Sequence, residues 1–261
     1  MIYTIAFENQ KGGVAKTTSC CNFAVGLYDL GKKVVVIDMD PQGTATKAFL
    51  KADDVYAMSV KECFEDAANT VKAILHTDSG VDLIPSSESP DILEGYKMEM
   101  MQDAFLGKRK TENRLKKMIR EIRDLYDFCL IDCGPATDIY SLNACICSDL
   151  IIVPVMPVKK AIESFKATLN QINASREEFD CDNKYKILIT MVNRNNNDRD
   201  YVRQLAEMFG EDCFDTMIRY QAKPVASADN SGKFVIRDVT KEAKVAQDYR
   251  DLVKEFLGER E

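Results

Sequence analysis

The sequence of 261 residues predicts a doubly wound α/β fold, a mostly parallel sheet with helices on both faces. Short β-branched apolar runs alternate along the chain with amphipathic segments of helical length. The runs consist of almost uninterrupted Val, Ile and Leu, which is typical of parallel strands covered on both faces. No internal repeat or Pro/Gly-rich linker interrupts this order, so we expect residues 1–261 to form a single domain.

The apolar runs predict six strands, at residues 2–7, 34–37, 81–84, 128–131, 150–155 and 187–192. Helices are expected between them, at residues 18–30, 114–126, 161–172, 198–208 and 245–257. The first ends before Gly31, a common helix C-terminal signal. The second carries one apolar stripe, made by Leu115, Met118, Ile119, Ile122 and Leu125.

Composition excludes several classes of protein. No apolar run is long enough to cross a membrane, and the N-terminus lacks the cationic start and cleavage site of a secretory signal. The nine cysteines are odd in number and lie partly in apolar runs, which favours reduced cysteines in the cytoplasm. The net charge of −7 argues against nucleic-acid binding by the surface as a whole, although residues 108–123 and 216–237 are locally basic.

The segment FENQKGGVAKTTSC, residues 7–20, connects the first strand to the first helix. It resembles the phosphate-binding pattern G-x-x-x-x-G-K-[ST], with Lys16 and Thr17 in the last two positions but Gln10 and Ala15 in the glycine positions. Backbone N–H groups at such a junction form a concave anion site, which the helix N-terminus reinforces. We therefore expect Lys16 to contact terminal phosphates and the Thr17 hydroxyl to bind Mg²⁺.

Gly12 and Gly13 in the same loop allow the backbone to approach phosphates without a Cβ in the way. Three aspartates complete the predicted site. Asp38 and Asp40 follow the second strand and Asp132 follows the fourth, so all three should face the crevice at the carboxyl ends of the strands. Such carboxylates can hold metal-bound water and orient an attacking water.

Four segments, KGGVAKTT, DMDPQGTAT, YDFCLIDCGPATD and SLNACICSDLIIVPV, follow one another between residues 11 and 155. In this order they resemble the ParA family of DNA-partitioning ATPases, of the short type without an N-terminal helix-turn-helix segment. The loop then corresponds to the family's deviant Walker A motif of a P-loop NTPase. The resemblance implies ATP and Mg²⁺ as cofactors and slow ATP hydrolysis.

The resemblance also implies a role for each matching residue. Lys11, Lys16 and Asp40 are the implied catalytic residues: Lys11 reaches the phosphates of a partner subunit in an ATP-sandwiched homodimer, and Asp40 positions the hydrolytic water. The implied metal ligands are Thr17, Asp38 and Asp132. The nucleotide contacts are expected from Lys11, Gly12, Gly13, Val14, Ala15, Lys16, Thr17, Thr18 and Asp132.

Partners are implied in the same way: a second copy of the chain, a ParB-like centromere-binding protein that stimulates hydrolysis, and double-stranded DNA bound without sequence preference. The expected DNA contacts are Lys223, Arg219, Arg194 and Arg203, with Arg199 beside them and the basic segment 109–123 as the next candidate. No membrane contact is expected, and the protein should lie in the cytoplasm on the nucleoid.

Two residues depart from the family pattern. Ala15 stands where most relatives have glycine, and a left-handed backbone there would cost about 1 kcal/mol. Gly134 replaces the first proline of the family's D-x-P-P and should loosen the loop after Asp132.

Sister families share the deviant loop, so alternatives stay open. A MinD-like positioning ATPase should end in a basic amphipathic helix, whereas this chain ends in the acidic YRDLVKEFLGERE. A nitrogenase-like reductase needs bridging cysteines, and Cys133 lies too close to Asp132 for that role. A bacterial tyrosine kinase would need a tyrosine-rich tail. An ATP-binding regulatory switch with little hydrolysis remains the main non-enzymatic alternative.

Overall fold

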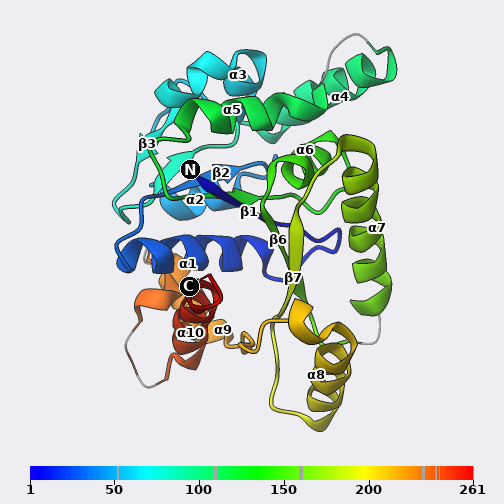
Figure 1. Cartoon of the computed structure of the whole chain (residues 1–261). Helices are drawn as coiled ribbons and strands as arrows, with labels where there is room; N and C mark the ends of the chain where they lie inside the picture. Colours follow the sequence, from blue (N-terminus) through cyan, green and yellow to red (C-terminus); the bar gives the residue numbers. More distant parts are fainter. Residues whose placement is uncertain are drawn as a thin grey trace.

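A computed structural model describes residues 1–51, 53–107, 111–158, 161–230, 233–238, 240 and 242–260, without the side chains of 161–164 and 227–230. The described chain forms a sheet with the strand order β3-β4-β2-β5-β1-β6-β7 (Figure 1). All neighbouring strands pair in parallel except β3 and β4. The strands are β1 (Tyr3–Phe7), β2 (Val34–Asp38), β3 (Leu75–His76), β4 (Asp82–Ile84), β5 (Phe128–Asp132), β6 (Leu150–Val155) and β7 (Lys184–Ile189).

Helices cover both faces of this sheet, which confirms the predicted fold class (Figure 1). The α-helices are α1 (Lys16–Asp29), α2 (Thr44–Phe49), α3 (Val60–Glu65), α4 (Pro90–Phe105), α5 (Arg114–Ile122), α6 (Ile139–Cys147), α7 (Ala161–Phe179), α8 (Asn196–Phe209), α9 (Ala222–Asn230) and α10 (Lys244–Gly258). Short 3₁₀ helices are η1 (Ala67–Ala73), η2 (Thr111–Asn113), η3 (Gly210–Asp212) and η4 (Val235–Arg237).

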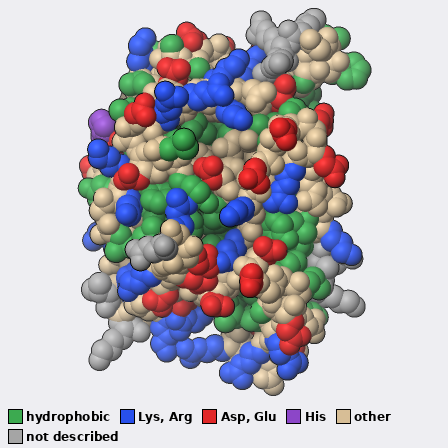
Figure 2. Space-filling view, in the orientation of Figure 1, with side chains coloured by type: hydrophobic (Ala, Val, Ile, Leu, Met, Phe, Trp, Pro, Cys, Tyr) green, Lys and Arg blue, Asp and Glu red, His purple; other side chains and the backbone are tan. Residues whose placement is uncertain are grey.

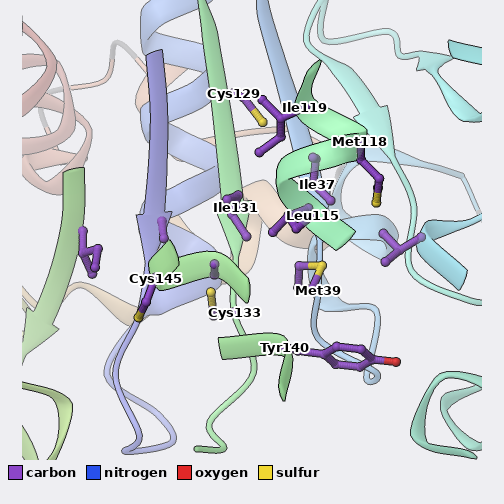
Figure 3. Packing of buried hydrophobic residues seen from close by; sticks show 14 of the residues in the cluster. Ile37, Met39, Leu115, Met118, Ile119, Cys129, Ile131, Cys133, Tyr140 and Cys145 are labelled. Carbon is purple, nitrogen blue, oxygen red and sulfur yellow. The ribbon is translucent and has the colours of Figure 1, made fainter. Parts of the chain in front are cut away.

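The hydrophobic core consists of two layers, one on each face of the sheet. One layer joins the sheet to α3, α4, α5, α6 and α7, and Figure 3 shows Ile131, Cys133 and Cys145 packed in it with residues of α5. The other layer joins the sheet to α1, η4 and α10. Seven of the nine cysteines are buried, as expected for small apolar side chains.

Several predicted boundaries were wrong. The last strand runs over Lys184–Ile189 instead of 187–192, because the chain turns after Thr190 and Val192 makes only an isolated bridge to Arg219. The second predicted helix ends at Ile122, so Leu125 lies beyond it and is 46% exposed instead of extending the apolar stripe. The two-residue strand β3 was not predicted. Among the described residues, no helix is long and apolar enough to cross a membrane.

The strand register brings three strand ends to one edge of the sheet. Asp132 at the end of β5 pairs in register with Phe7 of β1 on one side and with Asp38 of β2 on the other. The loops that follow β1, β2 and β5 therefore leave the sheet side by side, as the crevice prediction requires.

Candidate functional site

The loop between β1 and α1 is held by hydrogen bonds from the neighbouring strands. The side-chain amide of the buried Asn9 donates to the carbonyl of Pro154 in β6 (2.7 Å), and its Oδ1 accepts from the Lys11 N–H (2.9 Å). The Thr190 hydroxyl, just after β7, donates to the carbonyl of Val14 (3.0 Å). Two strands distant in sequence thus fix both halves of the loop.

The N-terminus of α1 is left open toward this loop. Ala15 is its N-cap residue, in the left-handed region with φ 62° and ψ 34°, and no side chain caps the helix. The first turn carries no acidic residue, and Gly12 and Gly13 are exposed beside it. Uncapped N–H groups at a helix start favour an anion. Ala15 therefore has the left-handed backbone that was expected to carry an energetic cost at this position, since its φ is positive.

Two lysines lie in the loop in different ways. Lys16 is only 7% exposed, and its ammonium donates to the carbonyl of Lys11 (3.2 Å), so its charge lies inside the loop. The Lys11 side chain is half-buried and has no ion-pair partner within the described part of the chain. Thr17 and Thr18, both half-buried, follow in the first turn of α1.

Asp132 is a fully buried carboxylate at the end of β5. Its exposure is 0%, and neither of its oxygens has a partner within the described residues. Burial raises the pKa of Asp132 well above its usual range, as does the charge of Asp38, whereas the nearby Thr17 hydroxyl lowers it. A buried polar atom without a partner is costly, so this side chain is arranged for a group that the protein does not itself supply.

Asp38 is satisfied by the chain itself. One oxygen accepts from the backbone N–H and the hydroxyl of Thr46 (2.7 Å each), and the other accepts from the Asp40 N–H (3.1 Å). Burial raises the pKa of Asp38 to about 6 against the lowering effect of these bonds. Asp38 therefore shapes the loop that carries Asp40, next to Asp132 in register.

Asp40 lines a small cavity. Its carboxylate accepts from the Gln42 N–H (3.0 Å), and its side chain is 9% exposed. A Cβ added at Gly134 would stand 3.4 Å from Asp40 Oδ1, so the missing side chain leaves room beside this carboxylate. The cavity, of ≈170 Å³, is also lined by Lys97 and Asp138.

Glu8 belongs to the same region and was not predicted. It directly follows β1, is fully buried, and neither carboxylate oxygen has a hydrogen-bond partner in the described chain. Burial raises the pKa of Glu8 to about 8, although the Cys133 thiol and the Lys16 charge oppose this. The available signal was an acidic residue directly after a buried strand, the same signal that identified Asp132.

The residues fit a Mg²⁺ ion bound together with phosphates. In the described residues, no group of three or more His, Cys, Asp and Glu side chains could hold a metal ion. Mg²⁺ commonly uses one or two protein oxygens and keeps water or phosphate oxygens for the rest. The partnerless Asp132 and the neighbouring Thr17 hydroxyl match that requirement.

The predicted DNA-contacting cations differ in availability. Arg194, Arg219 and Lys244 line one groove of ≈320 Å³ with Tyr220. The Arg219 guanidinium is already paired with Asp248, with Nε at 2.8 and 3.0 Å from its oxygens. Arg194 is exposed and has no ion pair with any described residue.

The other cations form separate groups on the surface. Lys223 is exposed near the start of α9, and Arg203 makes only long, exposed contacts with Asp200 and Glu207 (3.7 and 4.0 Å). Figure 2 shows Lys and Arg gathered at the lower edge near α8 and across the upper part over α5. The α5 group includes Lys116, Lys117 and Arg120, whereas residues 108–110 of the predicted basic segment lie outside the described residues.

Comparisons with known proteins agree with this geometry. An AAA-domain family model matches residues 2–187. The sporulation initiation inhibitor protein Soj of Bacillus subtilis is 29% identical over 258 residues, covering 97% of this chain and 98% of that protein. The chromosome-partitioning ATPase Soj of Treponema pallidum is 28% identical over 257 residues, covering 98% and 97%.

A solved structure extends the likeness to the whole fold. Cobyrinic acid a,c-diamide synthase from Mycobacterium smegmatis, crystallised with an ATP analogue and magnesium, superposes with a TM-score of 0.78 at 25% identity, covering 98% of this chain and 95% of that one. The chain thus belongs to the AAA-domain family, as a homologue of the Soj and ParA partitioning ATPases.

Proposed function

We propose that residues 1–261 form one ATPase domain that binds Mg²⁺·ATP at the β1–α1 loop, hydrolyses it slowly and acts in DNA partitioning. The observation that carries the proposal is the pairing of an uncapped α1 N-terminus with a buried, partnerless Asp132 beside it. The helix N-terminus favours binding of phosphate, and the Asp132 carboxylate favours binding of a cation. Mg²⁺·ATP supplies both.

The chain's residues divide the work between binding and hydrolysis. Backbone N–H groups from Gly12 to Thr18 and the Lys16 ammonium hold the phosphates, and Thr17 and Asp132 hold the metal. Asp38 supports the metal site indirectly, because it accepts hydrogen bonds from the backbone N–H groups of Asp40 and Thr46. Asp40 orients the attacking water, a role suited to a carboxylate that lines the cavity beside the site. Bound Mg²⁺ neutralises charge on the phosphates.

Two variants separate binding from hydrolysis. Lys16→Ala should abolish binding of a fluorescent ATP analogue, because it removes the buried cation of the loop. Asp40→Ala should bind the analogue like the parent and lose phosphate release. Normal turnover by Asp40→Ala would exclude Asp40 as the water-orienting residue. Asp53→Ala, on an exposed carboxylate outside the site, is the control.

The partnerless Lys11 supports an ATP-dependent homodimer. Lys16 already serves the phosphates within one subunit, so Lys11 is available to the nucleotide of a second copy. Light scattering of Asp40→Ala should give a dimer with ATP and a monomer with ADP, and Lys11→Ala should stay monomeric with both. A monomer under every condition with the parent and Asp40→Ala would remove Lys11 from the site.

DNA binding by this dimer, without sequence preference, is proposed at the groove of Arg194 and Lys244 and at Lys223. A dimer doubles each group of cations. Because these cations would neutralise DNA phosphates, the affinity for DNA should depend steeply on salt concentration. In a gel-shift salt series on random duplex DNA, Arg194→Glu and Lys223→Glu should each weaken binding by Asp40→Ala with ATP. Binding equal to that of the unmutated background would move the DNA surface to the exposed cations of α5.

The proposed role in the cell follows from the same resemblance. A ParB-like centromere-binding protein would stimulate hydrolysis, and the ATP dimer would reside in the cytoplasm on nucleoid DNA. Adding the DNA-binding protein encoded beside this gene to the ATPase assay tests the first statement: a severalfold rise in phosphate release is expected. An unchanged rate would favour a nucleotide switch with little turnover.

A further inference from the structure

A cavity of ≈800 Å³ lies at the edge of the sheet opposite to the β1–α1 loop. Its wall includes Tyr28 at the end of α1, Lys33 before β2, His76 of β3, Asp82 at the start of β4 and Tyr126 before β5. These residues lie at the amino ends of β2, β4 and β5, whereas the β1–α1 loop lies at the carboxyl edge. We call this cavity the α1–β3 pocket.

The α1–β3 pocket is separate from the ATP site. In Figure 1, α1 runs from the loop on the right to the left edge, where its end and β3 border the pocket. The helix has 14 residues, so about 21 Å of helix separates the two places. The volume of the pocket lies in the range of small-molecule sites.

The walls of the α1–β3 pocket offer apolar and aromatic surface to solvent. Tyr28, Val71 and Leu125 are 40%, 50% and 46% exposed, and Ile74 and Tyr126 are half-buried. Two of these five side chains are aromatic, and a ring packed against a ring gains more than its apolar area alone provides. An occupant therefore needs an apolar body, and an aromatic body fits best.

The acids of the pocket already have partners. One oxygen of Asp82 accepts the Tyr126 hydroxyl (2.6 Å), and the other lies 2.7 Å from His76 Nδ1. Asp29 forms an ion pair with the Arg237 guanidinium (2.7 Å). Three acids that flank the pocket are engaged too: Asp78 with the Lys51 ammonium (2.6 Å), Asp124 with Arg123 Nε (3.4 Å) and Asp127 with the Lys33 N–H (2.8 Å). A cationic ligand thus finds no unpaired carboxylate among the described residues that line the pocket.

Two lysines of the pocket, in contrast, are free. Lys32 is half-buried and Lys33 exposed, and neither ammonium forms an ion pair with any residue that the structure describes. They directly follow α1, and the Lys32 N–H donates to the carbonyl of Leu27 (3.1 Å). Positive charge there complements the helix C-terminus, and this effect needs no direct bond that would occupy the ammonium groups. Both therefore remain available to an anion.

We propose that the α1–β3 pocket binds a small aromatic anion, with its rings against Tyr28, Tyr126 and Leu125 and its carboxylate, sulfonate or phosphate group at Lys32 and Lys33. Exposed apolar walls select the rings, and two free ammoniums beside engaged acids select the charge. Binding here does not depend on the ATPase function proposed above, because the pocket shares no residue with the nucleotide site.

Two fluorescent probes with the same rings test the charge and the location separately. Anilinonaphthalene sulfonate carries an anionic group, and N-phenylnaphthylamine is its neutral counterpart. In fluorescence titrations of the nucleotide-free protein, Lys32→Gln/Lys33→Gln should weaken binding of the sulfonate about tenfold or more and leave the neutral probe unchanged, because only the sulfonate uses the ammoniums. The control is Lys184→Gln/Lys254→Gln, the same change at two exposed lysines outside the pocket.

A change in the wall tests the location. Leu125→Ser should weaken both probes, because it removes apolar surface that the rings contact. Lys16→Ala should bind the sulfonate like the parent; a loss there would place the probe in the β1–α1 loop and overturn the proposal.

Three other results would also overturn it. Equal affinity of the parent and Lys32→Gln/Lys33→Gln for the sulfonate, or equal weakening of both probes by this double variant, excludes the anion contact. Equal affinity of the parent and Leu125→Ser for both probes excludes the pocket, as does a parent that binds neither probe. Circular dichroism and thermal unfolding show whether the variants are folded, and Leu125→Ser keeps the test decisive if the lysine variant is not.

Discussion

Replacing Ala15 with glycine should stabilise the nucleotide-free protein. Ala15 is the N-cap residue of α1 with φ 62° and ψ 34°. An L-residue in this region costs about 1–2 kcal/mol, which glycine does not incur. Glycine loses more backbone entropy on folding, about 0.5–1 kcal/mol. At the middle of both ranges the difference is a gain of about 0.75 kcal/mol for Ala15→Gly. For a chain of this size that corresponds to a rise in Tm of about 1–4 °C.

Thermal and urea unfolding of the parent and the variant measure this gain. The same chemical change at Ala104, an exposed position inside α4, should have the opposite sign and cost about 0.5–1 kcal/mol, because that residue is helical. Because both residues can keep the loop conformation, ATP affinity should change little. An Ala15→Gly protein that unfolds at or below the parent's midpoint refutes the claim that this backbone is strained.

Three further outcomes are expected. Burial raises the pKa of Glu8 to about 8 from an ordinary 4.5, so between these values the folded state keeps a proton that the unfolded chain releases. The stability of the parent should therefore fall as pH rises from 5 to 8, and urea midpoints of Glu8→Gln should fall less. Arg219→Ala should destabilise the protein by about 1–3 kcal/mol, because it removes the guanidinium that pairs with the buried Asp248, which keeps the backbone N–H of residue 219. Gly80→Ala should lower the Tm, because φ is +88° and the added Cβ would collide with the Tyr28 ring.

The central strands could be predicted from sequence because each is a buried apolar run that ends in a chemical signal. β2 and β5 both finish on an aspartate, and β1 runs directly into the glycine-containing loop. The two-residue β3 has too few residues to show a pattern. The predicted apolar stripe of α5 was correct up to Ile122 and wrong at Leu125, because the spacing of apolar residues does not show where the helix ends.

In the candidate site too, residues with a signal local in sequence could be predicted, and residues that act through tertiary contacts could not. Lys16 and Thr17 were predictable because their spacing from the glycines is local in sequence. Asn9 and Thr190 were not, since they act through hydrogen bonds to Pro154 and Val14, more than a hundred residues away. The pairing of Arg219 with Asp248 is likewise tertiary, and it makes Arg219 a weaker candidate for phosphate contact than sequence position suggested.

The electrostatics of the sheet edge connect binding to turnover. Burial raises the pKa of both Asp38 and Asp132, and the charges of Asp38 and Asp40 raise the pKa of Asp132 further, because like charges in a poorly solvated place oppose ionisation. Asp38 offsets this with three hydrogen bonds, whereas Asp132 has none within the described chain. A divalent cation at Asp132 would favour its ionised form and supply the missing partner. Asp132→Asn should therefore weaken Mg²⁺ binding and turnover together while leaving the phosphate contacts of the loop in place.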